Sequence, residues 1–286
     1  MRGMNGEMDN LRVVLVAVRN SLNIGAVARA MSNFGAMQLR VVNPYEAAWR
    51  EAKSAVGAAE LLARAEECAT VAQAVADCSL VVGTTAVGNR ELRQPLRSLP
   101  EAGPAIREKL AESNVALLFG SEKRGLSNES LSYCHWLLRI PTREEHRSMN
   151  LGQAVAVCLY ELGGELATKA PNTARRRKVG GKKRALRVAS HGSKKKDGAE
   201  APSRPRSTGG TRAGEGVPAR METVERIGES WLRALEKSGY VAQRGKATAE
   251  EKLRRMLRRF SLQEDDAEVF LGMVKKVLWK LEEGKK

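Results

Sequence analysis

Ser148 and Asn150 are the side chains best placed for chemistry in the polar segment that runs from residue 140 to residue 154. The segment follows an apolar run at 136–140, typical of a short buried strand, and leads into a helical pattern at 151–165. Serine and asparagine cap helices, and the first amides of a helix can face a ligand. A strand, a polar loop and a helix start together predict a ligand site. An ordinary strand-to-helix loop remains an alternative for this segment alone.

Three further polar or glycine-rich segments follow predicted strands, at residues 23–29, 84–90 and 120–127. Parallel strands end at one edge of a sheet, so the four segments should meet around one ligand. Asn23 and Arg29 are six residues apart, about 600° of helical rotation, and therefore do not share a helix face. Both would serve one site only if Asn23 lies in the loop before the helix. A solvated arginine remains the alternative for Arg29.

The segment at 120–127 is close to a phosphate-binding P-loop but lacks its lysine. In that motif a lysine and then a serine or threonine follow the second glycine, and here Leu126 follows Gly125. Without this cation the loop loses its main contact to a triphosphate. We therefore exclude a nucleoside-triphosphatase and interpret the segment as a turn that presents Glu122, with Ser127 capping the next helix.

Alternating apolar runs and helical patterns predict an α/β domain with a largely parallel sheet. Its strands are expected at residues 11–18, 37–42, 80–83, 115–119 and 136–140. Helices are expected between them, including a long alanine-rich one at 46–65 and shorter ones at 70–76 and 105–111. With 42% hydrophobic residues in 286, the chain can bury a substantial core.

The net charge of +16 is concentrated in one part of the chain. Residues 1–168 hold 18 Lys and Arg against 18 Asp and Glu, residues 169–220 hold 16 against 3, and residues 221–286 hold 15 against 12. The basic segment is rich in Gly, Ser and Pro, which predicts a disordered linker at 169–220 after an α/β domain at 10–168. Its charge favours nucleic acid as a partner, although a merely solubilising linker remains an alternative.

Residues 221–286 predict a small C-terminal helical domain of three helices. The apolar residues at helical spacing are expected in its core; they are Val224, Ile227, Trp231, Leu235, Leu253, Met256, Leu257, Phe260, Val269, Phe270, Met273, Val277, Trp279 and Leu281. Four arginines of the middle helix are expected on its outside, as a solvated face or as an RNA contact: Arg254, Arg255, Arg258 and Arg259.

The cysteines and histidines argue against a metal centre. Four cysteines form no C-x-x-C pair and three histidines are scattered, which disfavours zinc or a disulfide framework and favours a reducing compartment. The polar, acidic start of the chain does not resemble a signal peptide, and no apolar run is long enough to span a bilayer. We therefore predict a cytoplasmic protein without a membrane contact.

Four motifs together resemble the SPOUT RNA methyltransferases, in particular the TrmH-type branch that methylates ribose 2′-hydroxyl groups. They are Asn23-Ile-Gly-Ala-x-x-Arg29, Phe119-Gly-x-Glu122 with Gly125-Leu126-Ser127, Ile140-Pro141, and Ser148-Met-Asn150. The segment at 80–86 and the helical tail around 251–259 are most similar to members that methylate the pyrimidine opening the tRNA anticodon loop, at position 32. The similarity covers residues 10–167 well and 221–283 more loosely.

The resemblance implies a trefoil-knotted sheet, an exception to the rule that chains are unknotted, together with a homodimer and S-adenosylmethionine as cofactor. The positions that match the family's cofactor contacts are Thr84, Thr85, Ala86, Gly120, Ile140, Ser148 and Met149. The positions that match its catalytic pocket are Arg29, Asn23, Glu122, Ser148 and Asn150. Ser121 departs from the related sequences, which carry an arginine there.

The chemistry implied is methyl transfer to a ribose hydroxyl of tRNA, for which in-line placement of the nucleophile matters more than acid–base power. A guanidinium is always protonated in proteins, so Arg29 is expected to hold the hydroxyl or its phosphate and to stabilise developing negative charge. Two alternatives stay open, the same reaction on ribosomal RNA and a non-catalytic RNA-binding protein.

Overall fold

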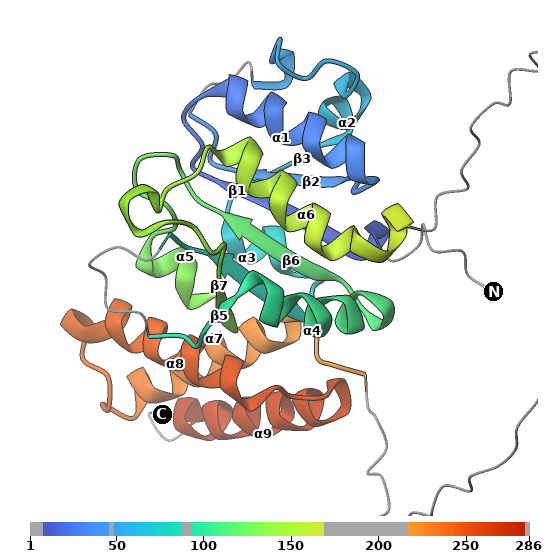
Figure 1. Ribbon diagram of the computed structural model, residues 1–286. Helices are drawn as coiled ribbons and strands as arrows, with labels where there is room; N and C mark the ends of the chain where they lie inside the picture. Colours follow the sequence, from blue (N-terminus) through green and yellow to red (C-terminus); the bar gives the residue numbers. More distant parts are fainter. Residues whose placement is uncertain (1–7, 46–48, 87–92, 169–216, 284–286) are drawn as a thin grey trace, which may run out of the picture. The chain divides into compact units, whose positions relative to one another are not determined.

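The computed structural model describes residues 8–45, 49–86, 93–168 and 217–283 (Figure 1). Within these ranges seven strands form one parallel sheet, in the order β3-β2-β1-β6-β4-β7-β5. They are β1 (Leu11–Val16), β2 (Gln38–Val42), β3 (Glu66–Cys68), β4 (Leu80–Thr84), β5 (Leu96–Ser98), β6 (Val115–Phe119) and β7 (Trp136–Arg139). The predicted parallel α/β fold is therefore confirmed. Strand β4 lies between β6 and β7, so the chain crosses over the sheet repeatedly; the knot itself stays a prediction.

Helices cover both faces of the sheet. They are α1 (Ser21–Phe34), α2 (Ala59–Arg64), α3 (Val71–Val75), α4 (Leu99–Glu112), α5 (Asn128–Ser132), α6 (Leu151–Thr168), α7 (Met221–Lys237), α8 (Lys246–Phe260) and α9 (Glu264–Glu283). In β1, Val13 and Leu15 join the core under α1, α2, α4 and α6, whereas Val14 joins the core under α3, α5 and α7. Successive strand residues point to opposite faces, so a sheet covered on both faces needs a continuous apolar run.

Helix α1 begins and ends at residues suited to those positions. The side chain of Asn20 accepts a hydrogen bond from the amide of Leu22 at 2.9 Å, and Gly35 ends the helix in the left-handed conformation, with φ 73°. Asn23, which could share a site with Arg29 only if it lay in the loop before the helix, instead lies in the first turn of α1. Helix α1 packs beside α6, the helix predicted at 151–165 (Figure 1).

The long helix predicted at residues 46–65 is wrong. Residues 46–48 lie outside the described ranges, Trp49–Glu51 form a single turn of 3-10 helix (η2), and α2 begins only at Ala59. Gly57 has φ 75°, a left-handed conformation that suits glycine and interrupts a right-handed helix. Alanine content favours a helix locally but does not remove this break. The three-residue edge strands β3 and β5 were also not predicted.

The C-terminal helices pack on the face of the sheet that α3 and α5 also cover. The amide of Met221 donates to the carbonyl of Cys78 at 2.9 Å, and that of Glu222 donates to Ala76 at 3.0 Å. Val224 and Ile227 share a hydrophobic cluster with the sheet residues Val81 and Leu118. The helical tail therefore completes the core of this face.

The four arginines of α8 were expected on the exposed side of the C-terminal helical domain, and this expectation is wrong for two of them. Arg254 and Arg258, with 9% and 3% of their surfaces exposed, face the α/β domain. Arg254 donates to the hydroxyl of Ser132 at 3.0 Å and lies over the ring of Tyr133, and Arg258 pairs with Glu225. Residues four apart share a helix face, which explains why these two arginines are buried together.

The apolar stripe predicted to bury α9 is largely exposed. Its buried residues are Ala267, Leu271, Val274 and Leu278. Val269, Met273 and Val277, from the predicted stripe, are 59%, 61% and 55% exposed, and Trp279 is 46% exposed. Helix α9 carries two apolar stripes, and the one that starts with the small residue Ala267 packs against α7.

Most of the predicted basic linker, residues 169–216, lies outside the described ranges. Its last four residues are described and ordered: Ala219 is buried, and Pro218 forms a β-bridge with Gln263. Across the described ranges, no helix combines the length and the apolar character needed to cross a membrane.

Candidate active site

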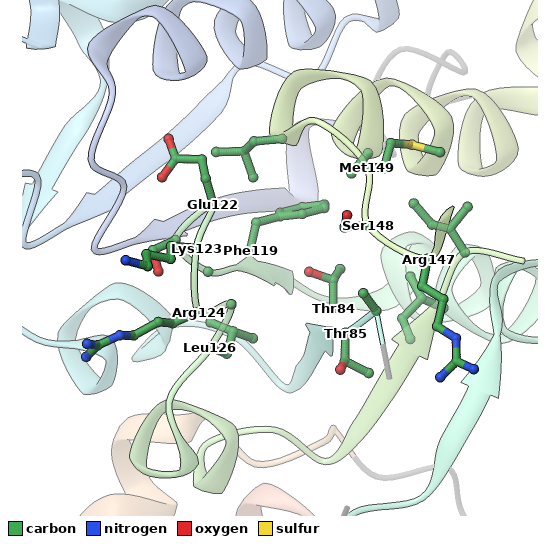
Figure 2. Close-up of a pocket in the computed structure, with 18 of the residues that line it drawn as sticks. Thr84, Thr85, Phe119, Glu122, Lys123, Arg124, Leu126, Arg147, Ser148 and Met149 are labelled. Carbon is green, nitrogen blue, oxygen red and sulfur yellow. The ribbon is translucent and has the colours of Figure 1, made fainter. Parts of the chain in front are cut away.

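A cavity of about 480 Å³ opens where β4, β6 and β7 end and α6 begins (Figure 2). This volume lies within the range of about 300–1,000 Å³ that is usual for small-molecule sites. All seven residues predicted to contact a cofactor line it: Thr84, Thr85, Ala86, Gly120, Ile140, Ser148 and Met149. The tertiary structure thus brings together three loops that are separate in the sequence, at residues 84–86, 120 and 140–149, as the parallel sheet predicts.

The turn after β6 depends on two glycines. A side chain on Gly120 would lie 2.0 Å from the backbone carbon of Gly125, so position 120 has no room for one. Gly125 has φ 65°, and its amide donates to the carbonyl of Ser121 at 2.8 Å. The closed turn presents Glu122 at the cavity, and Ser127 then caps α5 as predicted, accepting from the amide of Ser130.

Glu122 fixes the loop that leads into α1. Its carboxylate accepts hydrogen bonds from the backbone amides of Arg19 and Asn20, at 3.2 and 3.3 Å. It also accepts one from the side-chain amide of Asn23 at 2.7 Å. These contacts join two loops 99 or more residues apart at the edge of the cavity.

Asn23 and Asn150 extend this contact into a chain of hydrogen bonds. The side-chain nitrogen of Asn150 donates to the oxygen of Asn23 at 3.0 Å, and the oxygen of Asn150 accepts from the amide of Gly152 at 3.0 Å. A carboxylate only accepts and backbone amides only donate, so the two ends of the chain fix the orientation of both side-chain amides. The site therefore holds both asparagines in one orientation.

The side chain of Asn150 caps the first turn of α6. Its side-chain oxygen accepts from the amides of Gly152 and Gln153, at 3.0 and 3.4 Å. The expectation that the first helical amides face a ligand is therefore wrong for these two. Ser148 and Met149 line the cavity instead, above Thr84 and Thr85 in the view of Figure 2.

Glu122 is poorly suited to accept a proton. Partial burial alone would raise the pKa of its carboxyl, but the hydrogen bonds from the Asn23 side chain and from the amides of Arg19 and Asn20 outweigh this and hold the pKa below its ordinary value. A general base works best with a pKa near the operating pH. Glu122 is thus an anionic anchor for residues 19–23, the end of the loop and the first turn of α1.

Sequence reasoning missed the apolar lining and the cationic rim of the cavity. Phe119, Leu126, Leu138, Leu151 and Ala154 supply apolar surface, and Lys123, Arg124 and Arg147 add positive charge. In Figure 2 Arg124 and Arg147 extend on opposite sides of the cavity. These residues could have been predicted to line the cavity from their place in the sequence, because they flank the same strand ends as the predicted site residues.

Three predicted catalytic residues, Asn23, Asn150 and Arg29, are absent from the described lining of the cavity. The two asparagines are joined to the lining residue Glu122 by hydrogen bonds, whereas Arg29 is exposed on α1. Because six residues of α-helix rise about 9 Å, Arg29 lies well along the axis from Asn23 and on another face. Among the described side chains, no cluster of three or more His, Cys, Asp or Glu could hold a metal ion.

The arrangement suits group transfer by positioning. An apolar slot lies beside a carboxylate and two oriented amides, and the only carboxylate that lines the described cavity, Glu122, has a lowered pKa. Such a site can orient two reactants and exclude water, which by itself lowers a reaction barrier substantially.

A model of the SpoU rRNA Methylase family matches residues 10–160. The tRNA (cytidine/uridine-2'-O-)-methyltransferase TrmJ of Sodalis glossinidius is 39% identical over 156 residues, which are 54% of this chain and 61% of that protein. TrmJ of Escherichia coli K12 is 40% identical over 156 residues, 54% of this chain and 63% of its own. The match thus spans about three-fifths of these relatives. The crystal structure of TrmJ from Z. mobilis ZM4 is 26% identical, with a TM-score of 0.69 over 93% of this chain and 98% of that one.

Proposed function

Because this chain belongs to the SpoU rRNA methylase family, we propose that it transfers methyl groups from S-adenosylmethionine to ribose 2′-hydroxyl groups of tRNA. The observation that carries the proposal is the convergence of all seven cofactor positions on one cavity of about 480 Å³. S-adenosylmethionine would supply an activated methyl group on a sulfonium. The cavity suits this group, because Leu126, Leu138 and Leu151 offer apolar surface to a purine and Glu122 offers negative charge to a cation.

The side chains of this protein act in the proposed reaction by placing the hydroxyl. Asn23 and Asn150 are fixed in orientation by Glu122 and by the start of α6. They lie next to Glu122, outside the lining itself, and would contact the ribose at this edge of the cavity, where Ser148 is also found. Because the pKa of Glu122 is lowered, solvent or the RNA itself would accept the proton of the ribose hydroxyl. Orientation of the reactants would supply most of the acceleration of methyl transfer.

The substrate proposed is the pyrimidine at position 32 of tRNA. The similar proteins from Sodalis glossinidius and E. coli carry the name tRNA (cytidine/uridine-2'-O-)-methyltransferase. Similarity to the Z. mobilis structure extends over 93% of this chain, which includes the helical tail and favours tRNA over ribosomal RNA. A tRNA substrate also places the activity in the cytoplasm.

We further propose that the protein acts as a homodimer and that Arg29 reaches the site of the second protomer. Large hydrophobic side chains are exposed on the layer formed by α1 and α6: Leu22 is 52% and Tyr160 is 62% exposed. If a second copy of the chain covered this layer, these side chains would be buried. Arg29, which is exposed on the same helix as Leu22, would then lie near the cavity of the second protomer. Burial of apolar surface would drive the association.

Methyl transfer from labelled S-adenosylmethionine to bulk tRNA, with the modified nucleotide mapped, tests the reaction. We expect a 2′-O-methylated pyrimidine at position 32. Labelling of ribosomal RNA alone would keep the chemistry and overturn the substrate. A folded protein that binds no S-adenosylmethionine and labels neither RNA would favour the non-catalytic alternative.

Mixed dimers test the place of Arg29. Arg29→Ala and Asn150→Ala are each expected to be inactive. In a heterodimer of the two, the Arg29→Ala protomer keeps Asn150 and receives Arg29 from its partner, so random mixing of a twofold dimer should restore about a quarter of wild-type activity. If mixed dimers form and remain inactive, Arg29 does not act across the interface.

A further inference from the structure

The arginines of α8 divide into two pairs with different surroundings. Arg254 and Arg258 are buried against the α/β domain, where Glu225 pairs with both. Arg255 and Arg259 instead line a second cavity, of about 260 Å³, between α8 and the segment that precedes β5. Lys252 lines it as well, and positions 252, 255 and 259 share one face of a helix.

This second cavity is strongly cationic. Arg93, from the segment before β5, faces it together with Lys252, Arg255 and Arg259. Arg255 pairs with Glu251 at 3.2 Å. Among the residues that the structure describes, no carboxylate lines this cavity beside its four cations. Cations gathered in a hollow raise the local concentration of anions more than cations spread over a convex surface.

His135 adds a neutral polar ring to the lining. Burial, together with the positive charge of Arg258, lowers the pKa of its imidazole to about 3, so the ring is uncharged at neutral pH. Its Nδ1 accepts a hydrogen bond from the amide of Val81 at 3.0 Å, which leaves the ring proton on Nε2. The ring is thus a hydrogen-bond donor that does not add to the charge of the cavity.

The cationic cavity is linked to the cofactor cavity through α5. The side chain of Gln94, which lines the cationic cavity, donates to the carbonyl of Leu131 at 2.7 Å. Leu131 lines the cofactor cavity and also a small hollow that it shares with Arg93 and Arg255. An anion held beside α8 would therefore have a defined position relative to the cofactor site.

We propose that the cavity bounded by Arg93, Lys252, Arg255 and Arg259 binds a backbone phosphate of the RNA substrate. The proposal rests on the proposed function, since it presupposes an RNA substrate. Guanidinium groups match phosphate oxygens in paired hydrogen bonds, and a polyanion supplies many phosphates to a fixed cation site. The contact orients the RNA so that one ribose reaches the cofactor cavity, whereas the buried pair Arg254 and Arg258 holds α8 in place.

The salt dependence of tRNA binding by the full chain tests the proposal. The variant Lys252→Gln/Arg259→Gln removes two exposed cations of the cavity. The matched control, Arg226→Gln/Lys275→Gln, removes one arginine and one lysine exposed on α7 and α9 and outside the cavity. We expect the cavity variant to bind tRNA about tenfold more weakly at low salt, with the slope of log K against log salt reduced by about 1. The control should keep the wild-type slope within about 0.3 of a unit.

Equal losses of tRNA affinity and of salt slope in the two variants would overturn the proposal, because they would reflect net charge alone. The affinity for S-adenosylmethionine should be unchanged in both variants and shows that they are folded. If inorganic phosphate stabilises the wild type but not the cavity variant while the tRNA slope is unchanged, the cavity holds a free anion and the RNA assignment is wrong. A reduced slope in a protein that methylates no tRNA would sustain the phosphate site and overturn the proposed function. Absence of any tRNA binding by the wild type would overturn both.

Discussion

The side-chain nitrogen of Asn150 lies 3.0 Å from the side-chain oxygen of Asn23, 127 residues earlier in the chain. This contact joins the start of α6 to the start of α1 at the edge of the cofactor cavity. Its polarity is set at both ends, since Glu122 only accepts hydrogen bonds and the amides of α6 only donate them. Asn150 therefore has two separable roles, to cap a helix and to orient Asn23.

Substitutions at Asn150 should separate these roles. Asn150→Ala loses the cap and should lower the free energy of unfolding by about 0.5–2 kcal/mol. Asn150→Asp keeps a capping oxygen and should retain most of that stability, but it cannot donate to Asn23. We expect its methyl-transfer rate to fall at least about tenfold, a cost of about 1.4 kcal/mol in the transition state. Urea denaturation and kcat measure the two effects, and an Asn150→Asp enzyme with the wild-type kcat would show that the contact to Asn23 is dispensable.

Gly120→Ala should damage the cofactor site. The added carbon would lie 2.0 Å from the backbone of Gly125, so the turn after β6 must open. We expect the affinity for S-adenosylmethionine, measured by calorimetry, to fall more than about tenfold. Gly272→Ala on α9 is the matched control, because no atom lies within 4 Å of its added carbon. It should stabilise the protein by about 0.5–1 kcal/mol and leave cofactor binding unchanged; similar affinities in both variants would contradict the prediction.

Arg258→Met should strongly destabilise the protein. The side chains of Arg258 and Glu225 are 1% and 17% exposed, so the substitution leaves a mostly buried carboxylate without its main partner. We expect a loss of about 3–5 kcal/mol in the free energy of unfolding, much of it recovered in Arg258→Met/Glu225→Met. Arg259→Met, at the exposed neighbouring position, should change the stability by less than about 0.5 kcal/mol. Urea midpoints that are equal for the two single variants would refute the structural role of the buried pair.

Asp77 should make the stability of the fold depend on pH in the acid range. Burial opposes ionisation of its carboxyl, but the hydrogen bond and charge of Arg40, with a further contribution from Arg12, lower its pKa from 3.8 to about 2. A lowered pKa in the folded state means that the unfolded state binds the proton more readily. The stabilisation is therefore complete well above pH 3.8 and is lost as the pH falls through 3.8 toward about 2.

Asp77→Asn isolates this contribution. The difference in the free energy of unfolding between wild type and variant, from urea titrations, should be constant above about pH 5 and shrink as the pH approaches 2. A difference that stays the same across this range would mean that Asp77 has an ordinary pKa in the folded protein.

Patterns in the amino-acid sequence were sufficient to predict the parallel sheet and the loops that line the cofactor cavity. Strands covered on both faces are recognisable as continuous apolar runs, which is why β1, β2, β4, β6 and β7 were predicted near their observed positions. The cofactor positions follow the ends of these strands, so finding the strands was enough to place Thr84, Gly120 and Ser148 at one edge of the sheet.

Which face of a helix is buried depends on the packing of elements distant in the sequence. Helix α9 has two apolar stripes, and packing against α7 selected Leu271 and Val274 rather than Val269 and Met273. Helix α8 has four arginines of similar local context, and only the position of Glu225 and α5 distinguishes the buried pair from the pair at the cationic cavity. Periodicity tells which residues share a face, but the free energy of burial depends on the atoms opposite that face, and those come from distant parts of the chain.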